Sequence, residues 1–122
     1  MTHRMALLIA LGVSAFLTLV IAVVTLAPVS GLPGMQVSDK IYHALAFGSL
    51  AFPVTVVRPR WWAATILVIA VYGGLIEVIQ PFVGRSMELN DWFADIIGAA
   101  IGAGAGAVVG LLMGSRLGLR RA

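Results

Sequence analysis

Four long stretches with almost no charged side chain dominate the sequence. Crossing the ~30 Å hydrocarbon core of a bilayer takes roughly 17–25 helical residues, and each stretch is that long. The composition agrees, because 61% of the residues are hydrophobic and only 11% are charged, a balance that excludes an ordinary water-soluble globule. We therefore predict an all-α fold, an integral membrane four-helix bundle that forms a single domain over residues 1–122. The predicted transmembrane helices cover residues 6–29, 41–57, 61–83 and 92–114.

The segments that flank these stretches set their connections. Arg4 precedes the first stretch, as in a signal peptide, but the stretch is much longer than the ~7–15 apolar residues of a signal peptide and lacks a small-residue cleavage motif. We therefore expect it to be retained. The proline- and glycine-rich segment 28–34 is expected to end this helix, and Ser38 to cap the next one. Only residues 58–60 separate the second and third spans, which predicts an antiparallel hairpin.

The basic residues are distributed unevenly over the two sides of the predicted membrane. Six of the eight Lys and Arg residues fall on the side of the chain ends, and only Lys40 and Arg85 fall on the other. By the positive-inside rule, both termini are predicted to be cytoplasmic and these two residues to be outside. The basic residues form no clustered stripe, so we expect the lipid bilayer and no nucleic acid as a partner. The absence of cysteine excludes thiolate chemistry.

Ionisable residues within the spans gather near their outer ends. His43, Glu77 and Asp95 come from three different spans and are predicted to lie at similar depth. An ionisable group within hydrocarbon costs at least ~2.5 kcal/mol, so such groups turn inward and find partners. A hydrogen-bonded clamp that fixes helix register needs only one or two of them, whereas a binding site explains the whole set. The candidate ligand-binding residues are Asp39, Lys40, His43, Glu77, Gln80, Arg85, Asp91 and Asp95.

The predicted outer face combines helix dipoles with charged side chains. The second and fourth spans begin there, so their positive N-terminal ends lie beside Lys40 and Arg85. This arrangement favours an anionic ligand, such as a phosphate or carboxylate head group. Alternatively, His43 with Glu77 or Asp95 could transfer protons, and these three are the only catalytic candidates. One histidine with two or three carboxylates and Gln80 could hold a divalent cation through mostly oxygen ligands. No compact motif such as H-E-x-x-H occurs, however, so we expect neither a metal ion nor any other cofactor.

Glycine recurs at every fourth position of the last span, beside a parallel row of alanines. Small residues at this spacing let helix backbones approach closely, which predicts tight helix packing. The partner helix could belong to the same chain, to a second copy in a homo-oligomer or to a larger protein. We favour the same chain, because the alanine row continues into Asp91 and Asp95, which should not face lipid. Gly73 and Gly74 predict a kink or another close packing point. The glycine row comprises Gly98, Gly102, Gly106, Gly110 and Gly114.

Taken in order, these residues resemble the VanZ-like family of small bacterial membrane proteins, which is named for an accessory factor in teicoplanin resistance. The resemblance spans residues 39 to about 110 and implies a multi-pass envelope protein, but no particular reaction. Many relatives carry Asn where this chain has Asp95. The residues that carry the resemblance are Asp39-Lys40-x-x-His43-x-x-x-Phe47, Glu77-x-x-Gln80, Gly84-Arg85 and Asp91-x-x-Ala94-Asp95-x-x-Gly98-x-x-x-Gly102.

Three functions are compatible with these observations. The leading hypothesis is a VanZ-like protein of the bacterial cytoplasmic membrane with an outward-facing polar site for an anionic cell-envelope ligand, which contributes to glycopeptide resistance. That ligand would be a lipid-linked head group, a peptidoglycan precursor or a glycopeptide. The second hypothesis is a small membrane enzyme that uses His43 with Glu77 or Asp95 for proton transfer. The third is a structural subunit that docks a larger membrane partner through the glycine row.

Overall fold

The computed structural model describes residues 1–27 and 36–116, without the side chains of 36–39. This part of the chain contains four long helices and no strand. The helices are α1 (His3–Leu26), α2 (Gln36–Val57), α3 (Trp62–Ile79) and α4 (Leu89–Met113). Each lies in a segment long and apolar enough to cross a membrane. The all-α, four-span membrane fold predicted from the sequence is thus confirmed. The predicted break at 28–34 lies outside the described residues. The predicted N-cap at Ser38 is wrong, because α2 already begins at Gln36 and includes Ser38 in its first turn.

The third predicted span, 61–83, is divided in the structure. Its start belongs to the 3-10 turn η1 (Pro59–Trp61), and its end forms a second 3-10 turn, η2 (Gln80–Val83). Pro81 explains this second turn, because proline lacks the amide proton that an α-helix would use at that position. Gly84 then takes the left-handed conformation, with φ of 79°, which favours glycine. The chain therefore leaves α3 sharply and reaches α4 within a few residues.

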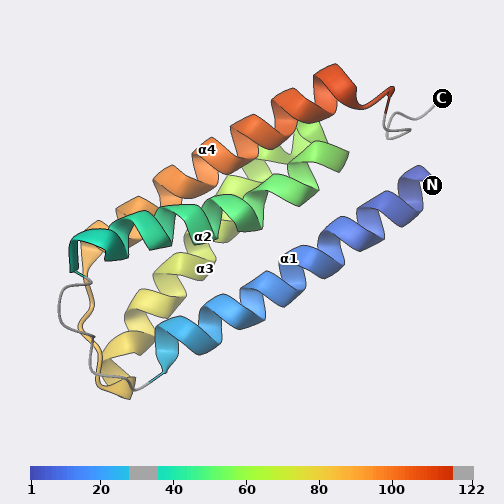
Figure 1. Ribbon diagram of the computed structural model, residues 1–122. Coiled ribbons are helices and arrows are strands. Elements are labelled where there is room, and N and C mark those ends of the chain that lie inside the picture. The colour runs from blue at the N-terminus through green and yellow to red at the C-terminus, as the bar shows by residue number, and fades with distance from the viewer. Residues whose placement is uncertain (28–35, 117–122) are drawn as a thin grey trace.

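The closest helix pair is α2 with α4, and the two lie side by side over most of their length (Figure 1). The glycine row of α4 makes this contact. A Cβ atom added at Gly98 would overlap the backbone of Ala44, and one added at Gly102 would overlap the backbone of Gly48. Gly106 and Gly110 face the last two turns of α2 in the same way. Close backbone packing of this kind supplies the van der Waals contact that holds helices together in lipid.

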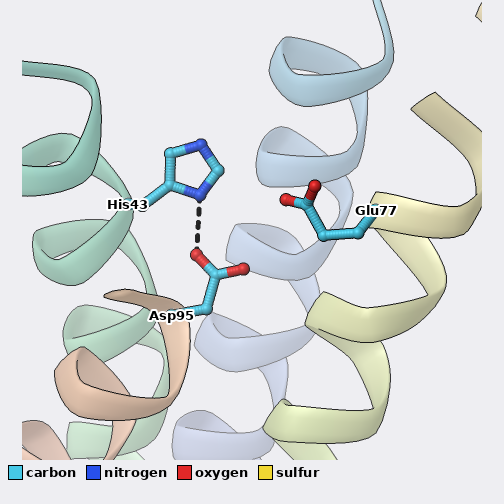
Figure 2. A group of neighbouring side chains, drawn as sticks. All are labelled: His43, Glu77 and Asp95. Atoms are coloured by element: carbon cyan, nitrogen blue, oxygen red, sulfur yellow. Dashed lines mark hydrogen bonds and ion pairs between the residues drawn. The ribbon is translucent and has the colours of Figure 1, made fainter. Parts of the chain in front are cut away.

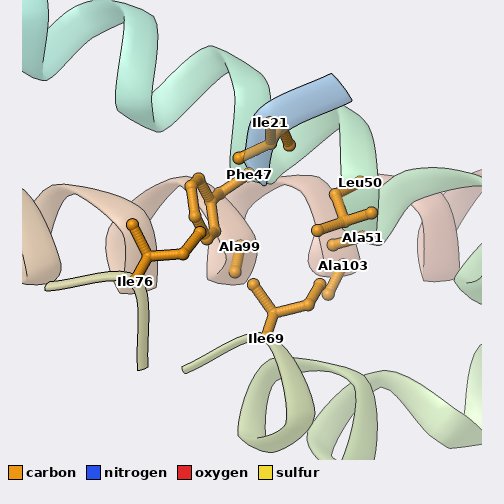
Figure 3. Close-up of a cluster of buried hydrophobic side chains, with 8 residues drawn as sticks. All are labelled: Ile21, Phe47, Leu50, Ala51, Ile69, Ile76, Ala99 and Ala103. Carbon is orange, nitrogen blue, oxygen red and sulfur yellow. The ribbon is translucent and has the colours of Figure 1, made fainter. Parts of the chain in front are cut away.

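A compact apolar core lies between the helices (Figure 3). Ala99 and Ala103, from the alanine row of α4, are fully buried within it, so they add little volume and let larger side chains from the other helices reach the centre. In contrast, all four helices leave large apolar side chains exposed on the outside, Phe16 and Leu112 among them, as expected where lipid surrounds the protein. The core residues are Ile21, Phe47, Leu50, Ala51, Ile69, Ile76, Ala99 and Ala103.

The first helix joins the bundle more loosely than the others. Only Ala6, Ala10 and Ile21 of α1 are buried. Two polar contacts tie the middle of α1 to its neighbours, because Ser14 donates a hydrogen bond to the backbone of Leu50, and the Tyr72 hydroxyl donates one to the backbone of Thr18. Helix α1 begins and α4 ends at the same end of the bundle (Figure 1). The cytoplasmic location of that end remains a prediction.

Candidate functional site

Five polar side chains are buried at the end of the bundle where α2 and α4 begin and where α1 and α3 end. They come from α2, α3, η2 and α4, and at most 8% of any of these residues is exposed. We refer to this group as the polar end cluster. Buried polar groups are costly unless they find partners, so their contacts show what the cluster can do. The polar end cluster consists of His43, Glu77, Gln80, Asp91 and Asp95.

The imidazole of His43 lies between two carboxylates of α4. Its Nδ1 is hydrogen-bonded to Oδ1 of Asp95 at 2.6 Å (Figure 2). Its Nε2 lies 4.0 Å from Oδ2 of Asp91. Asp91 and Asp95 are four residues apart, so one face of α4 presents both to the histidine. Below them the Phe47 ring stacks parallel to the imidazole, with 6.3 Å between the ring centroids. These contacts fix the ring and give a proton a short path between His43 and Asp95.

Glu77 approaches the same pair from α3. Figure 2 shows its carboxylate directed toward His43 and Asp95, and one ligand atom from each of the three residues lies within 4.8 Å of the other two. Oε2 of Glu77 accepts a hydrogen bond of 3.1 Å from the backbone amide of Glu88. Oε1 is buried and accepts none from the described residues. The structure therefore brings together three ionisable residues that are far apart in sequence.

Gly73 leaves the space that the Asp95 carboxylate occupies beside α3, a role that could not be assigned from the sequence. A Cβ atom at Gly73 would lie 2.9 Å from Oδ2 of Asp95 and 3.2 Å from the ring of Phe47. Any side chain here would therefore push the carboxylate away from its present place. The Gly73-Gly74 pair in the sequence indicated a kink or close packing, but the identity of the neighbour depends on how α3 is rotated against α4.

Lys40 lies at the exposed rim of the cluster. Its Nζ is 3.8 Å from Oε2 of Glu88 and 3.7 Å from Oδ1 of Asp91, and its side chain is 45% exposed. Lys40 thus places a positive charge where a ligand from solvent or from the lipid head groups would arrive. The side chain of Asp39, the remaining candidate on this turn of α2, lies outside the described residues.

Arg85 and Gln80 make their hydrogen bonds with the end of α1. The Arg85 guanidinium donates to the carbonyls of Val24 and Thr25, both at 3.0 Å, and the Gln80 amide donates to Thr25 at 3.3 Å. The last carbonyls of a helix have no partner within the helix, so these side chains cap α1. One sequence signal for this role is that the last turn of the first span contains no basic residue, so its final carbonyls need hydrogen-bond donors from elsewhere in the chain. Arg85 holds α1 to the loop in addition to any charge it offers a ligand.

The polar end cluster carries more negative charge than expected for the anion-binding site that the sequence suggested. The cluster buries three carboxylates, those of Glu77, Asp91 and Asp95, and Glu88 adds a fourth at the rim. Among these carboxylates, Lys40 forms ion pairs with Glu88 and Asp91. Chemically, the site can share protons between His43 and a carboxylate, accept hydrogen bonds through buried oxygens and attract a cation. An anionic ligand would need Lys40, the helix N-termini or a bound cation to offset this negative charge.

Comparison with known proteins gives one match. A family model described as VanZ/LLP1 matches residues 5–112, which include all four helices apart from the first two residues of α1 and the last one of α4. No curated protein and no solved structure matched the chain. The matched range contains His43, Glu77 and Asp95, and it confirms the resemblance found in the sequence.

Proposed function

Because this chain belongs to the VanZ/LLP1 family and is a multi-pass membrane protein, we propose that its polar end cluster binds the anionic head group of a cell-envelope molecule. The protein would lie in the cytoplasmic membrane of a bacterium, with the cluster facing outward. Its ligand would be a lipid-linked head group, a peptidoglycan precursor or a glycopeptide, and its action would contribute to glycopeptide resistance.

The observation that carries this proposal is the concentration of buried polar groups at one end. A single hydrogen-bonded pair, such as His43 with Asp95, is enough to fix the register of two helices. Three further residues are nevertheless buried beside it, at a cost that membrane insertion makes substantial. Two of their oxygens, Oε1 of Glu77 and Oε1 of Gln80, accept no hydrogen bond from the described residues. Such acceptors favour a role in binding over one in packing alone.

Under this proposal, the rim and the buried acceptors would recognise different parts of a head group. Phosphate or pyrophosphate oxygens would pair with Lys40 at the rim, where its side chain is half exposed. Hydroxyl or amide donors of the same head group would satisfy Oε1 of Glu77 and of Gln80. The hydrocarbon chain of a lipid-linked ligand would stay in the bilayer beside the apolar outer surface of the helices. A lipid-linked head group therefore fits better than a free anion.

Binding to purified protein in lipid nanodiscs tests this proposal. The probes are farnesyl pyrophosphate, inorganic pyrophosphate and teicoplanin, which separate a lipid-linked phosphate, a free phosphate and a glycopeptide. We expect farnesyl pyrophosphate to bind most tightly and Lys40→Gln to weaken it at least about fivefold, roughly 1 kcal/mol. Arg60→Gln removes an exposed charge at the opposite end and should leave the affinity unchanged. Equal losses in both variants, or no binding of any probe, would contradict the proposal.

A membrane enzyme is the second candidate, and the short hydrogen bond between His43 and Asp95 favours it. A carboxylate that orients an imidazole is half of the arrangement used by many general bases. If the protein is an enzyme, Glu77→Gln should abolish turnover of a bound ligand, whereas the affinity for that ligand should fall much less.

The third candidate, docking of a partner through the glycine row, is less well supported, because α2 of the same chain covers Gly98 to Gly110.

A further inference from the structure

Three buried donor groups from three helices converge at the polar end cluster. His43 offers an imidazole nitrogen, and Glu77 and Asp95 each offer a carboxylate oxygen, all within 4.8 Å of one another (Figure 2). Around one ion at 2.0–2.2 Å, tetrahedrally arranged ligand atoms lie about 3.3–3.6 Å apart. The three donor atoms therefore need to close their separations by no more than roughly 1.5 Å to share an ion, which rotations of the side chains can supply. We propose that His43, Glu77 and Asp95 bind one divalent transition-metal ion.

An independent observation at Glu77 supports this proposal. Only 3% of Glu77 is exposed, yet its Oε1 accepts no hydrogen bond from the described residues. A buried carboxylate oxygen without a donor is expensive. A cation beside it would remove that cost and would also reduce the repulsion between Glu77 and the carboxylates of α4. The hydrogen bond between Asp95 and His43 does not oppose this, because the same two groups attract either a shared proton or a metal ion.

The donor set selects the kind of ion. Mg²⁺ and Ca²⁺ prefer oxygen ligands alone, whereas an imidazole with two carboxylates suits Mn²⁺, Fe²⁺ or Zn²⁺. Three protein ligands also leave at least one coordination position open. An ion here would thus be able to bind a phosphate oxygen as well, and would offset the negative charge that the cluster presents to an anion. This bridging role rests on the proposed function, whereas the metal site itself does not.

No metal ion was expected from the sequence, because it contains no compact motif with ligands close together along the chain. Compact motifs arise when one helix supplies two ligands at positions i and i+4. Here each ligand comes from a different helix, at residues 43, 77 and 95. Their approach depends on the tight packing of α2 on α4 and on the space left by Gly73. Positions along the chain therefore indicate that the three residues lie at similar depth, but not that they approach one another.

Metal binding by the full chain in detergent tests the proposal without any envelope ligand. After treatment with a chelator, the protein would be titrated with Mn²⁺ by electron paramagnetic resonance and with Zn²⁺ by elemental analysis after gel filtration. We expect about one equivalent of either ion. Glu77→Gln, which keeps the shape of the side chain, should weaken binding at least tenfold. Glu88→Gln removes an exposed carboxylate at the same end of the bundle and should leave metal binding unchanged.

A second measurement covers the case in which Glu77→Gln does not fold. Mn²⁺ or Zn²⁺ should raise the Tm of the wild-type protein, Mg²⁺ should not, and a chelator should reverse the increase. No stoichiometric binding by the wild type, or equal losses in Glu77→Gln and Glu88→Gln, would overturn the metal site. Because no head group is present, failure of the metal site and failure of the proposed ligand would be seen in different experiments.

Discussion

His43 shows how a single buried residue can be held in a membrane protein. Carboxylates of Asp91 and Asp95 face its two ring nitrogens, and Phe47 stacks against the ring. Asp95 is completely buried, and its Oδ1 is hydrogen-bonded to His43. Helix α3 packs against Asp95 at Gly73, where an added Cβ atom would lie 2.9 Å from Oδ2 of Asp95. The absence of a side chain at Gly73 therefore lets the carboxylate keep its place.

We expect Gly73→Ala to destabilise the protein by about 1–3 kcal/mol, because the new methyl group overpacks the site. It would lie 2.9 Å from Oδ2 of Asp95, so the hydrogen bond to His43 should be lost or lengthened. Thermal unfolding in one detergent measures the effect. Gly104→Ala is the matched control, since a Cβ atom there has no neighbour within 4 Å. Equal melting temperatures for the two variants would show that Gly73 is not a tight contact.

At the scale of whole helices, the glycine row determines which pair packs most closely. Gly102 lies against Gly48, so two helix backbones meet with no side chain between them. This contact sets the height of α4 relative to α2, and therefore brings Asp95 level with His43. The contact between Gly102 and Gly48, near the middle of the bundle, thus controls the geometry of the polar end cluster.

Gly102→Leu should separate α2 from α4 and prevent assembly of the bundle. Leucine would replace a backbone contact with a side chain that has no space, and lipid offers no hydrophobic compensation for the lost packing. Yield in membranes and monodispersity in detergent would both fall severely. Gly104→Leu adds the same side chain two residues away on an open face, and it should behave like the wild type. If both leucine variants assemble normally, the row does not hold the pair together.

The helices were predictable from the sequence because bilayer thickness imposes their length. The helix ends were predicted less well, because hydropathy changes little there while the hydrogen-bonding pattern of the backbone changes. Pro81 lies within an apolar stretch, and the switch to a 3-10 turn after Ile79 follows from its missing donor. Arg85 was expected to serve a ligand because it is basic and close to acidic residues. Its bonds to Val24 and Thr25 depend on where α1 ends relative to the loop, which hydropathy does not encode.

At the scale of the whole molecule, charge divides the protein into two different ends. The polar end cluster and its acidic rim occupy one end, whereas Arg4, Arg58 and Arg60 lie toward the other, where α1 begins. Similar depths for His43, Glu77 and Asp95 could be predicted from their positions in the spans. Their direct approach could not be predicted, because it requires the rotation of each helix about its axis. The side of the membrane that the cluster faces decides which ligands it meets.

The charge asymmetry predicts that the polar end faces outward and that both termini face the cytoplasm. Two serines, Ser86 in the loop after α3 and Ser115 just beyond α4, are exposed at opposite ends of the bundle. Because the chain has no cysteine, Ser86→Cys and Ser115→Cys each introduce one thiol with a nearly isosteric change. A membrane-impermeant maleimide should label Ser86→Cys in intact cells, and should label Ser115→Cys only after the membrane is permeabilised. The reverse pattern would place the cluster in the cytoplasm, where an extracellular glycopeptide cannot reach it, and only a cytoplasmic ligand would then be compatible with the site.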